Sequence, residues 1–286
     1  MPEPTFRRAA RVVDGVATSD GDGVNLTRII GTRALRELDP FLLLDEFKSD
    51  NPDDYIGGFP SHPHRGFETI TYLLHGEFTH RDSRGNEGHL TAGSVQWMTA
   101  GRGIIHSEMP AMTDGLVWGY QLWLNLPAEH KMTDPRYQDI PPEDIPVVAA
   151  DGVSVKVIAG EYGGAHGPAR TWIPAQYLDI TLAPGATFTQ PVPEELTCFA
   201  YVIEGEARVG PADSPEPGAP LQLLVLEDGD AVQLEAGEAG ARFLLLAARR
   251  LDEPIARQGP FVMNTMEEVY QAFADYQAGT FDKWGS

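Results

Sequence analysis

Short apolar runs separated by closely spaced glycines and prolines constrain the fold of this chain more than any other feature. The 286 residues include 30 glycines and 23 prolines, and the runs between them have the length of β-strands. FETITYLLHGEFTHRDS predicts a hairpin about Gly76, and VWGYQLWLNLP alternates large side chains as a strand does. We therefore predict an all-β fold.

A single short helix is predicted at the end of the chain, over about residues 265–278. Asn264 and Glu267 have the spacing of a capping box, which marks a helix N-terminus. The apolar stripe of this helix would be formed by Val269, Tyr270, Phe273 and Tyr276.

The strand signals fall into two halves. The segment PAEHKMTDPRYQDIPPEDIPVVAADG between them is rich in proline and charge and lacks strand alternation. We predict an N-terminal domain over residues 1–126, a connector over 127–152, and a C-terminal domain over 153–286 that includes the helix.

Two dipeptide patterns in the first half are suited to binding a metal ion. His62 and His64 are separated by one residue, as are His106 and Glu108. Side chains at i and i+2 of a strand point to the same face, and metal–nitrogen bonds are only about 2.0–2.1 Å long. Two such strands side by side would offer three imidazoles and one carboxylate to a single cation.

An internal repeat relates the two halves and predicts one metal site per chain. LLHGEF around Gly76 aligns with VIEGEA around Gly205, and the segment around Gly93 aligns with the one around Gly229. On that alignment the four candidate ligands fall on non-ligating residues of the second half, namely Pro191, Pro193, Arg242 and Leu244.

Composition excludes several classes of function. The net charge of −21 opposes direct binding to nucleic acid or to an anionic membrane, and no apolar run approaches the length of a membrane span. The single cysteine, Cys198, lies in an apolar strand and fits a reducing compartment. The N-terminus shows no secretory signal, so we expect a cytoplasmic protein.

The motifs resemble those of the cupins and, more closely, those of the pirin family. The cupin pattern is His62, His64, Glu68 and Gly76, followed by a glycine-turned strand pair that ends in His106. The pirin resemblance covers nearly the whole chain, through HPHRGFETITYLL, HRDSRGNEG, QWMTAGRGIIHSEMP and PFVMNTMEEVYQAFADYQAG. It implies two cupin domains in tandem, each a jelly-roll β-barrel or sandwich, with the metal site in the first domain only.

The resemblance also implies the ligands and the metal. In pirins the iron ligands correspond to His62, His64, His106 and Glu108, and the implied cofactor is one Fe(II) per chain, with other divalent transition metals binding in vitro. In many cupins the ligand is instead the carboxylate at the position of Glu68. Strand alternation favours Glu108, because it shares a face with His106; Glu68 would then be a hydrogen-bonding group near the site.

Members of the family show quercetin 2,3-dioxygenase activity, which opens the central ring of a flavonol with dioxygen and releases carbon monoxide. The resemblance thus implies a small aromatic, flavonol-like substrate and O2. Glu108 would accept the substrate's hydroxyl proton as a general base. The alternative is an iron- and redox-dependent regulatory protein that binds a transcription factor or a metabolic enzyme, and a third hypothesis is metal storage or sensing without chemistry.

The other histidines and aromatic residues near the motifs are interpreted as structural. His75, His80 and His89 flank predicted turns, and His130 and His166 lie in predicted loops. The aromatic and sulfur-containing side chains near the site are more often core residues of a barrel than pocket walls; they are Phe59, Phe67, Trp97 and Met98.

Overall fold

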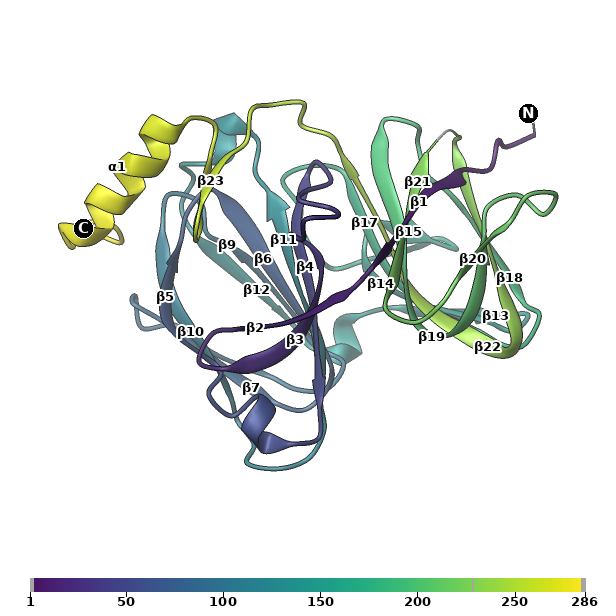
Figure 1. The fold of residues 1–286 in the computed structure, drawn as a ribbon, viewed down its shortest axis with the longest axis horizontal. Coiled ribbons are helices and arrows are strands. Elements are labelled where there is room, and N and C mark those ends of the chain that lie inside the picture. Colours follow the sequence, from purple (N-terminus) through teal and green to yellow (C-terminus); the bar gives the residue numbers. More distant parts are fainter. Residues whose placement is uncertain (1–2, 228, 284–286) are drawn as a thin grey trace. The chain divides into compact units, whose positions relative to one another are not determined.

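The computed structural model describes residues 3–227 and 229–283, and its strands form two compact units (Figure 1). Unit 1 comprises Met1–Val16, Thr32–Leu38 and Glu143–Arg250. Unit 2 comprises Ala17–Gly31, Asp39–Pro142 and Leu251–Ser286. The prediction of an all-β chain with one C-terminal helix is confirmed.

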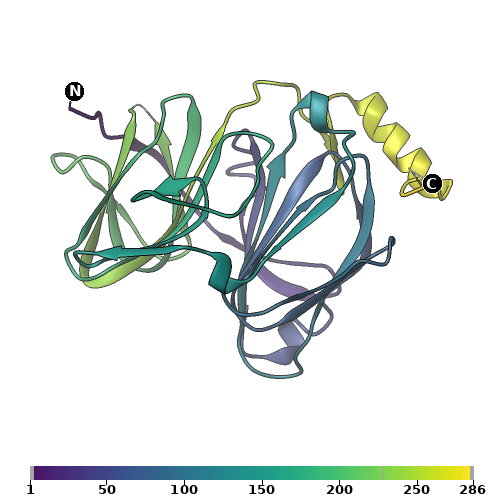
Figure 2. The same cartoon turned by 180° about the vertical axis from the view of Figure 1, so that it is seen from behind.

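Unit 2 contains a seven-stranded and a four-stranded sheet (Figure 2). The larger sheet has the order β12-β9-β6-β11-β4-β3-β2. Its strands are β2 (Val16–Asp20), β3 (Val24–Ile30), β4 (Phe41–Ser49), β6 (Phe67–His75), β9 (Val95–Thr99), β11 (Val117–Asn125) and β12 (Arg136–Ile140). The smaller sheet, β5-β10-β7-β8, contains β5 (Phe59–His64), β7 (Phe78–Asp82), β8 (Glu87–Leu90) and β10 (Ile104–Pro110). Short 3-10 helices occupy Pro52–Asp54, Ala128–His130 and Pro142–Asp144.

The pairing of β5 with β10 brings the two metal-binding dipeptides together. His106 lies directly opposite His62 in this antiparallel pair, and the register shifts by one residue before Glu108, which lies opposite Phe59. Gly66 then turns the chain from β5 into β6 with a φ of 90°. A Cβ at this position would lie 1.9 Å from the Val262 carbonyl oxygen, so only glycine fits.

Unit 1 has a nine-stranded sheet. Seven of its strands have the order β1-β21-β19-β22-β17-β14-β13, and in addition β18 pairs with β22 and β20 pairs with β19. Its strands are β1 (Arg8–Asp14), β13 (Val147–Ala150), β14 (Val153–Ala159), β17 (Ala175–Leu182), β18 (Thr187–Pro191), β19 (Leu196–Val209), β20 (Glu216–Gly218), β21 (Gln222–Glu227) and β22 (Ala231–Arg249). A small hairpin adds β15 (Glu161–Tyr162) and β16 (Ala165–His166). Buried apolar side chains, Phe188, Val232, Leu234 and Phe243 among them, form one large core.

The repeat is present in both units, but the sequence alignment of its second anchor is wrong. β10 pairs with β5 and β7, and the first part of β22 pairs in the same way with β18 and the end of β19. The segment after Gly229 is therefore the counterpart of β10, whereas the segment after Gly93 forms β9, whose counterpart is β21. The buried, inward-facing positions of the β18–β22 pair are Phe188, Gln190, Val232 and Leu234, so this pair offers no histidine or carboxylate where β5 and β10 carry the candidate ligands.

Two segments belong with parts of the chain that are distant in sequence. β12 forms within the segment predicted to be a connector, and it pairs along its length with β9. Residues 251–286 are part of unit 2, where they form the hairpin of β23 (Ala256–Gln258) and β24 (Phe261–Met263) and the helix α1 (Met266–Gln277).

Helix α1 differs from the sequence prediction in its cap and in its buried face. The capping box is formed by Thr265 and Glu268, one residue later than predicted. Val269 and Ala272 are buried and Phe273 packs against the same cluster, whereas Tyr270 and Tyr276 are exposed. None of the helices in the described part of the chain has the length and apolar character needed to cross a membrane.

Candidate metal centre

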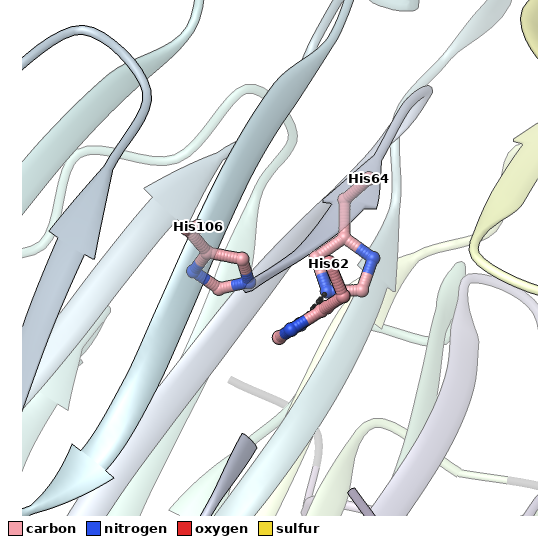
Figure 3. A group of neighbouring side chains, drawn as sticks. All are labelled: His62, His64 and His106. Carbon is pink, nitrogen blue, oxygen red and sulfur yellow. Dashed lines mark hydrogen bonds between the residues drawn. The ribbon is translucent and has the colours of Figure 1, made fainter. Parts of the chain in front are cut away.

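Three histidines gather on the inner side of the β5–β10 pair (Figure 3). His62 and His64 come from β5 and His106 from β10, and their rings point toward one another. The ring centres are 4.4 Å apart for His62 and His106, 4.6 Å for His62 and His64, and 5.0 Å for His64 and His106. Among the described residues this is the one group of three or more His, Cys, Asp or Glu side chains whose ligand atoms all lie within 4.8 Å of one another.

The ring nitrogens are arranged as a cation requires. The Nδ1 of His62 lies 2.7 Å from the carbonyl oxygen of Pro60, which can only accept, so this nitrogen carries the proton and Nε2 keeps its lone pair. That Nε2 lies 2.9 Å from the Nε2 of His64, close to the roughly 3 Å expected for two nitrogens at right angles on one metal ion. The Nε2 of His106 is buried without a hydrogen-bond partner in the described structure. These residues fit a transition-metal ion.

Burial keeps the imidazoles in the form that binds metal. Removal from water lowers the pKa of His64 well below its usual value, and the nearby His62 lowers it further. Burial likewise lowers the pKa of His106, with His62 and His64 adding to the effect. Both rings are therefore neutral at neutral pH, and a neutral imidazole is the form that a metal binds.

Glu108 lies on the same strand as His106 but outside the three-nitrogen group. Its side chain is buried, and the hydroxyl of Thr71 donates to Oε1 at 2.8 Å while the side-chain amide of Gln121 donates to Oε2 at 2.9 Å. Each oxygen keeps a lone pair beyond these bonds. The carboxylate is thus held in place by two neutral donors beside the histidines.

Glu68 faces away from this group. The pairing of β6 with β9 is regular from Glu68 to Tyr72, so Glu68 and Thr71 point to opposite faces of the sheet. Thr71 contacts Glu108, whereas Glu68 accepts a hydrogen bond of 2.7 Å from the Thr99 hydroxyl. Burial raises the pKa of Glu68 to about 7. Glu68 therefore lies on the face of β6 away from Thr71 and Glu108.

A cavity of about 830 Å³ opens beside the histidines, within the range of small-molecule sites. Its lining includes His62, His64 and Glu108, and the hairpin of β23 and β24 contributes Arg257 to the wall. The Arg257 guanidinium lies 4.7 Å from the ring centre of Trp123, whose ring centre is 5.1 Å from that of His64.

A bidentate ion pair forms a second polar group in the same cavity. Arg28 donates to Asp45 at 2.8 and 2.7 Å and to Asp20 at 2.8 Å, so its charge is already balanced by two carboxylates. The cavity therefore combines apolar and aromatic walls with cationic and anionic groups.

The structure changes the interpretation of two residues. Phe59 both lines the cavity and packs against a core cluster, whereas the sequence favoured the core position alone. His80, interpreted as flanking a turn, is buried on β7 and contacts His106. No local sequence signal identifies His80, because its proximity depends on the register between β7 and β10. Phe67, Trp97 and Met98 are core residues as expected.

Comparison with known proteins identifies the family. The family model described as Pirin matches residues 23–124, and the one described as Pirin C-terminal cupin domain matches residues 177–282. A Pirin-like protein of Solanum lycopersicum is 47% identical over 278 residues, which cover 96% of this chain and 94% of that protein. The chain belongs to the pirin family. The predicted pair of cupin domains is thereby confirmed.

Two further comparisons extend over most of the chain. Pirin of Homo sapiens is 46% identical over 261 residues, which cover 91% of this chain and 88% of the human protein. The crystal structure of quercetin 2,3-dioxygenase from Acinetobacter baumannii superimposes with a TM-score of 0.89 at 38% identity, covering 97% of this chain and 99% of that one.

Proposed function

We propose that this chain is an iron-dependent dioxygenase that cleaves a flavonol with O2, as a quercetin 2,3-dioxygenase does. The observation that carries the proposal is the group of three imidazoles beside a cavity of about 830 Å³. Similarity to the Acinetobacter baumannii enzyme over nearly the whole chain supports the choice of substrate class.

His62, His64 and His106 would hold one Fe(II), with Glu108 as a fourth ligand or as a base beside it. Bound iron would supply a Lewis acid for the substrate's ionised hydroxyl and redox chemistry toward dioxygen. Three histidines leave coordination positions open, which is what a metal that binds substrate requires. The imidazoles suit iron without excluding zinc, copper or nickel.

Glu108 would remove the hydroxyl proton of the substrate. Its carboxylate lines the cavity, and the bonds from Thr71 and Gln121 fix its orientation before substrate enters. The proton would pass to a carboxylate oxygen as the flavonol binds. The aromatic ring of Trp123 and the apolar walls would position the planar substrate and exclude water.

The test follows flavonol absorbance and carbon monoxide release when protein loaded anaerobically with iron is mixed with quercetin in air. We expect turnover that depends on iron content and that is absent in His64→Ala. His89→Ala, which alters an exposed histidine on β8, is the matched control and should retain full activity. Fully loaded protein that leaves quercetin intact would contradict the proposal and favour the regulatory alternative.

The variant Glu108→Gln distinguishes a role of Glu108 as a general base from a role in holding the metal. The amide keeps the shape of the side chain but cannot accept the proton, so iron content should stay substantial while turnover falls by about 10²–10⁴-fold. Iron measured by mass spectrometry and turnover measured on the same sample decide the point. Full activity in Glu108→Gln would remove Glu108 from the mechanism.

A further inference from the structure

His80 lies behind His106, on the side away from the other two histidines. Its Nε2 is 2.8 Å from the Nδ1 of His106, and its side chain is only 2% exposed. In the pairing of β7 with β10, His80 is directly opposite Glu108 and His106 is opposite Asp82. Directly opposite residues share a face, so His80 points to the same inner side as the candidate ligands.

The contact between the two histidines determines which nitrogen of His106 can bind a metal. A neutral imidazole has one N–H and one lone pair. If His106 donates from Nδ1 to the Nε2 of His80, its own Nε2 presents a lone pair toward His62 and His64. If His80 were the donor, the proton of His106 would occupy Nε2 and block coordination. The unpartnered, buried Nε2 of His106 agrees with the first arrangement.

The protein holds His80 in place independently of any ion. The Tyr137 ring packs against it with the ring centres 4.8 Å apart, and β8 pairs along the other edge of β7, with Gly88 opposite His80. Tyr137 comes from β12, so a strand far along the sequence sets the orientation of the His80 ring. That orientation in turn fixes the direction of the His106 ring through the 2.8 Å contact.

We propose that His80 is a positioning residue that selects the Nδ1–H tautomer of His106 and orients its Nε2 for metal binding. The inference rests on the metal site of the proposed function but not on any substrate. Removing a group that orients a metal ligand typically weakens metal affinity by about 10–100-fold.

Affinity and spectra of cobalt(II) test the proposal without a substrate. His80→Leu removes the acceptor, and we expect a 10–100-fold weaker cobalt(II) affinity and a changed visible spectrum. His80→Gln restores an acceptor oxygen near the position of Nε2 and should recover both to within a few fold. His89→Leu, on the neighbouring strand and exposed, is the matched control and should behave as wild type. Unchanged affinity and spectrum in His80→Leu would overturn the proposal.

A second measurement needs no variant and therefore remains decisive if His80→Leu does not fold. Nitrogen-15 NMR of the metal-free, histidine-labelled wild type distinguishes protonated from unprotonated ring nitrogens. We expect His106 to be protonated on Nδ1; protonation on Nε2 would overturn the assignment. A wild type that binds no cobalt(II) would refute the metal site itself, while the NMR result would still report on His80.

Discussion

Glu68 and Glu108 have the same side chain in different surroundings. Glu108 faces the cavity between two hydrogen-bond donors, and Glu68 is fully buried on the opposite face of β6 with the Thr99 hydroxyl as its donor. Burial outweighs the hydrogen bond from Thr99 and the attraction of the Arg136 charge, and it raises the pKa of Glu68 to about 7 from an ordinary 4.5.

This shift predicts that the titration of Glu68 makes the stability of the fold depend on pH. Between pH 4.5 and 7 the folded chain keeps the Glu68 proton while the unfolded chain has lost it. The free energy of unfolding therefore falls as pH rises through this interval, by at most about 3 kcal/mol. Glu68→Gln cannot ionise, so denaturant unfolding at several pH values should show the variant gaining stability relative to wild type from pH 4.5 to 7.5. Exposed Glu143→Gln is the control, and parallel curves for Glu68→Gln and wild type would contradict the prediction.

The position of Arg257 in the cavity wall predicts a preference for a particular kind of ligand. Its guanidinium packs on Trp123, near His64, and donates to the Leu42 carbonyl oxygen at 3.0 Å. A cation at this wall should favour a planar substrate with an ionised hydroxyl. We expect Arg257→Gln to weaken quercetin binding about 10-fold, corresponding to about 1.4 kcal/mol, with a smaller change in kcat.

Quenching of protein fluorescence by quercetin measures this affinity directly, and metal content measured on the same samples separates loss of binding from loss of the metal. Arg250→Gln replaces an exposed arginine shortly before the same segment and serves as the control. Equal affinity in Arg257→Gln and wild type would exclude Arg257 from ligand selection.

At the scale of single elements, helix α1 depends on its N-terminal cap. The Thr265 hydroxyl accepts from the Glu268 amide at 3.2 Å, and the Glu268 carboxylate accepts from the Thr265 amide at 2.9 Å. Thr265→Ala should cost about 1 kcal/mol and should increase hydrogen exchange in the first turn. Thr265→Ser keeps the acceptor and should preserve protection. Unaltered exchange in Thr265→Ala would show that packing alone holds the helix.

Local patterns in the sequence predicted elements well but not their pairing. The i, i+2 spacing placed His62 and His64 on one face of a strand, and that rule needs no partner strand. The cap was displaced by one residue, because Asn264–Glu267 and Thr265–Glu268 have the same spacing and only backbone geometry distinguishes them. The contact of His80 with His106 and the strand β12 depend on non-local register, which no local pattern encodes.

Register also explains the error in the internal repeat. SVQWMTAG and DAVQLEAG share a residue pattern, yet the first segment forms β9 and pairs with β6, while the second begins β22 and pairs with β18. Short apolar segments next to a glycine have similar sequences, so two segments that resemble each other can form strands that are not equivalent in the fold. The structural alignment changes which residues of the second half correspond to the ligands.

At the scale of the whole molecule, the two units share one arrangement of strands but differ in the side chains that it encloses. Unit 2 encloses a cavity beside three histidines, whereas unit 1 has a large core of apolar side chains. The inward-facing positions of the matching strand pair in unit 1 are Phe188, Gln190, Val232 and Leu234. They include no histidine and no carboxylate.

The difference between the units predicts one metal ion per chain. Metal-free protein titrated anaerobically with Fe(II), then desalted and measured by mass spectrometry, should retain one ion. The double variant His62→Ala/His64→Ala should retain none, since only His106 of the three-nitrogen group would remain.

Metal at about 100 times its Kd should stabilise wild type by about 2.7 kcal/mol, and a chelator should reverse the gain in Tm; the double variant should show neither effect. Two ions per wild-type chain, or one retained by the double variant, would place a metal site outside the three histidines and refute the assignment.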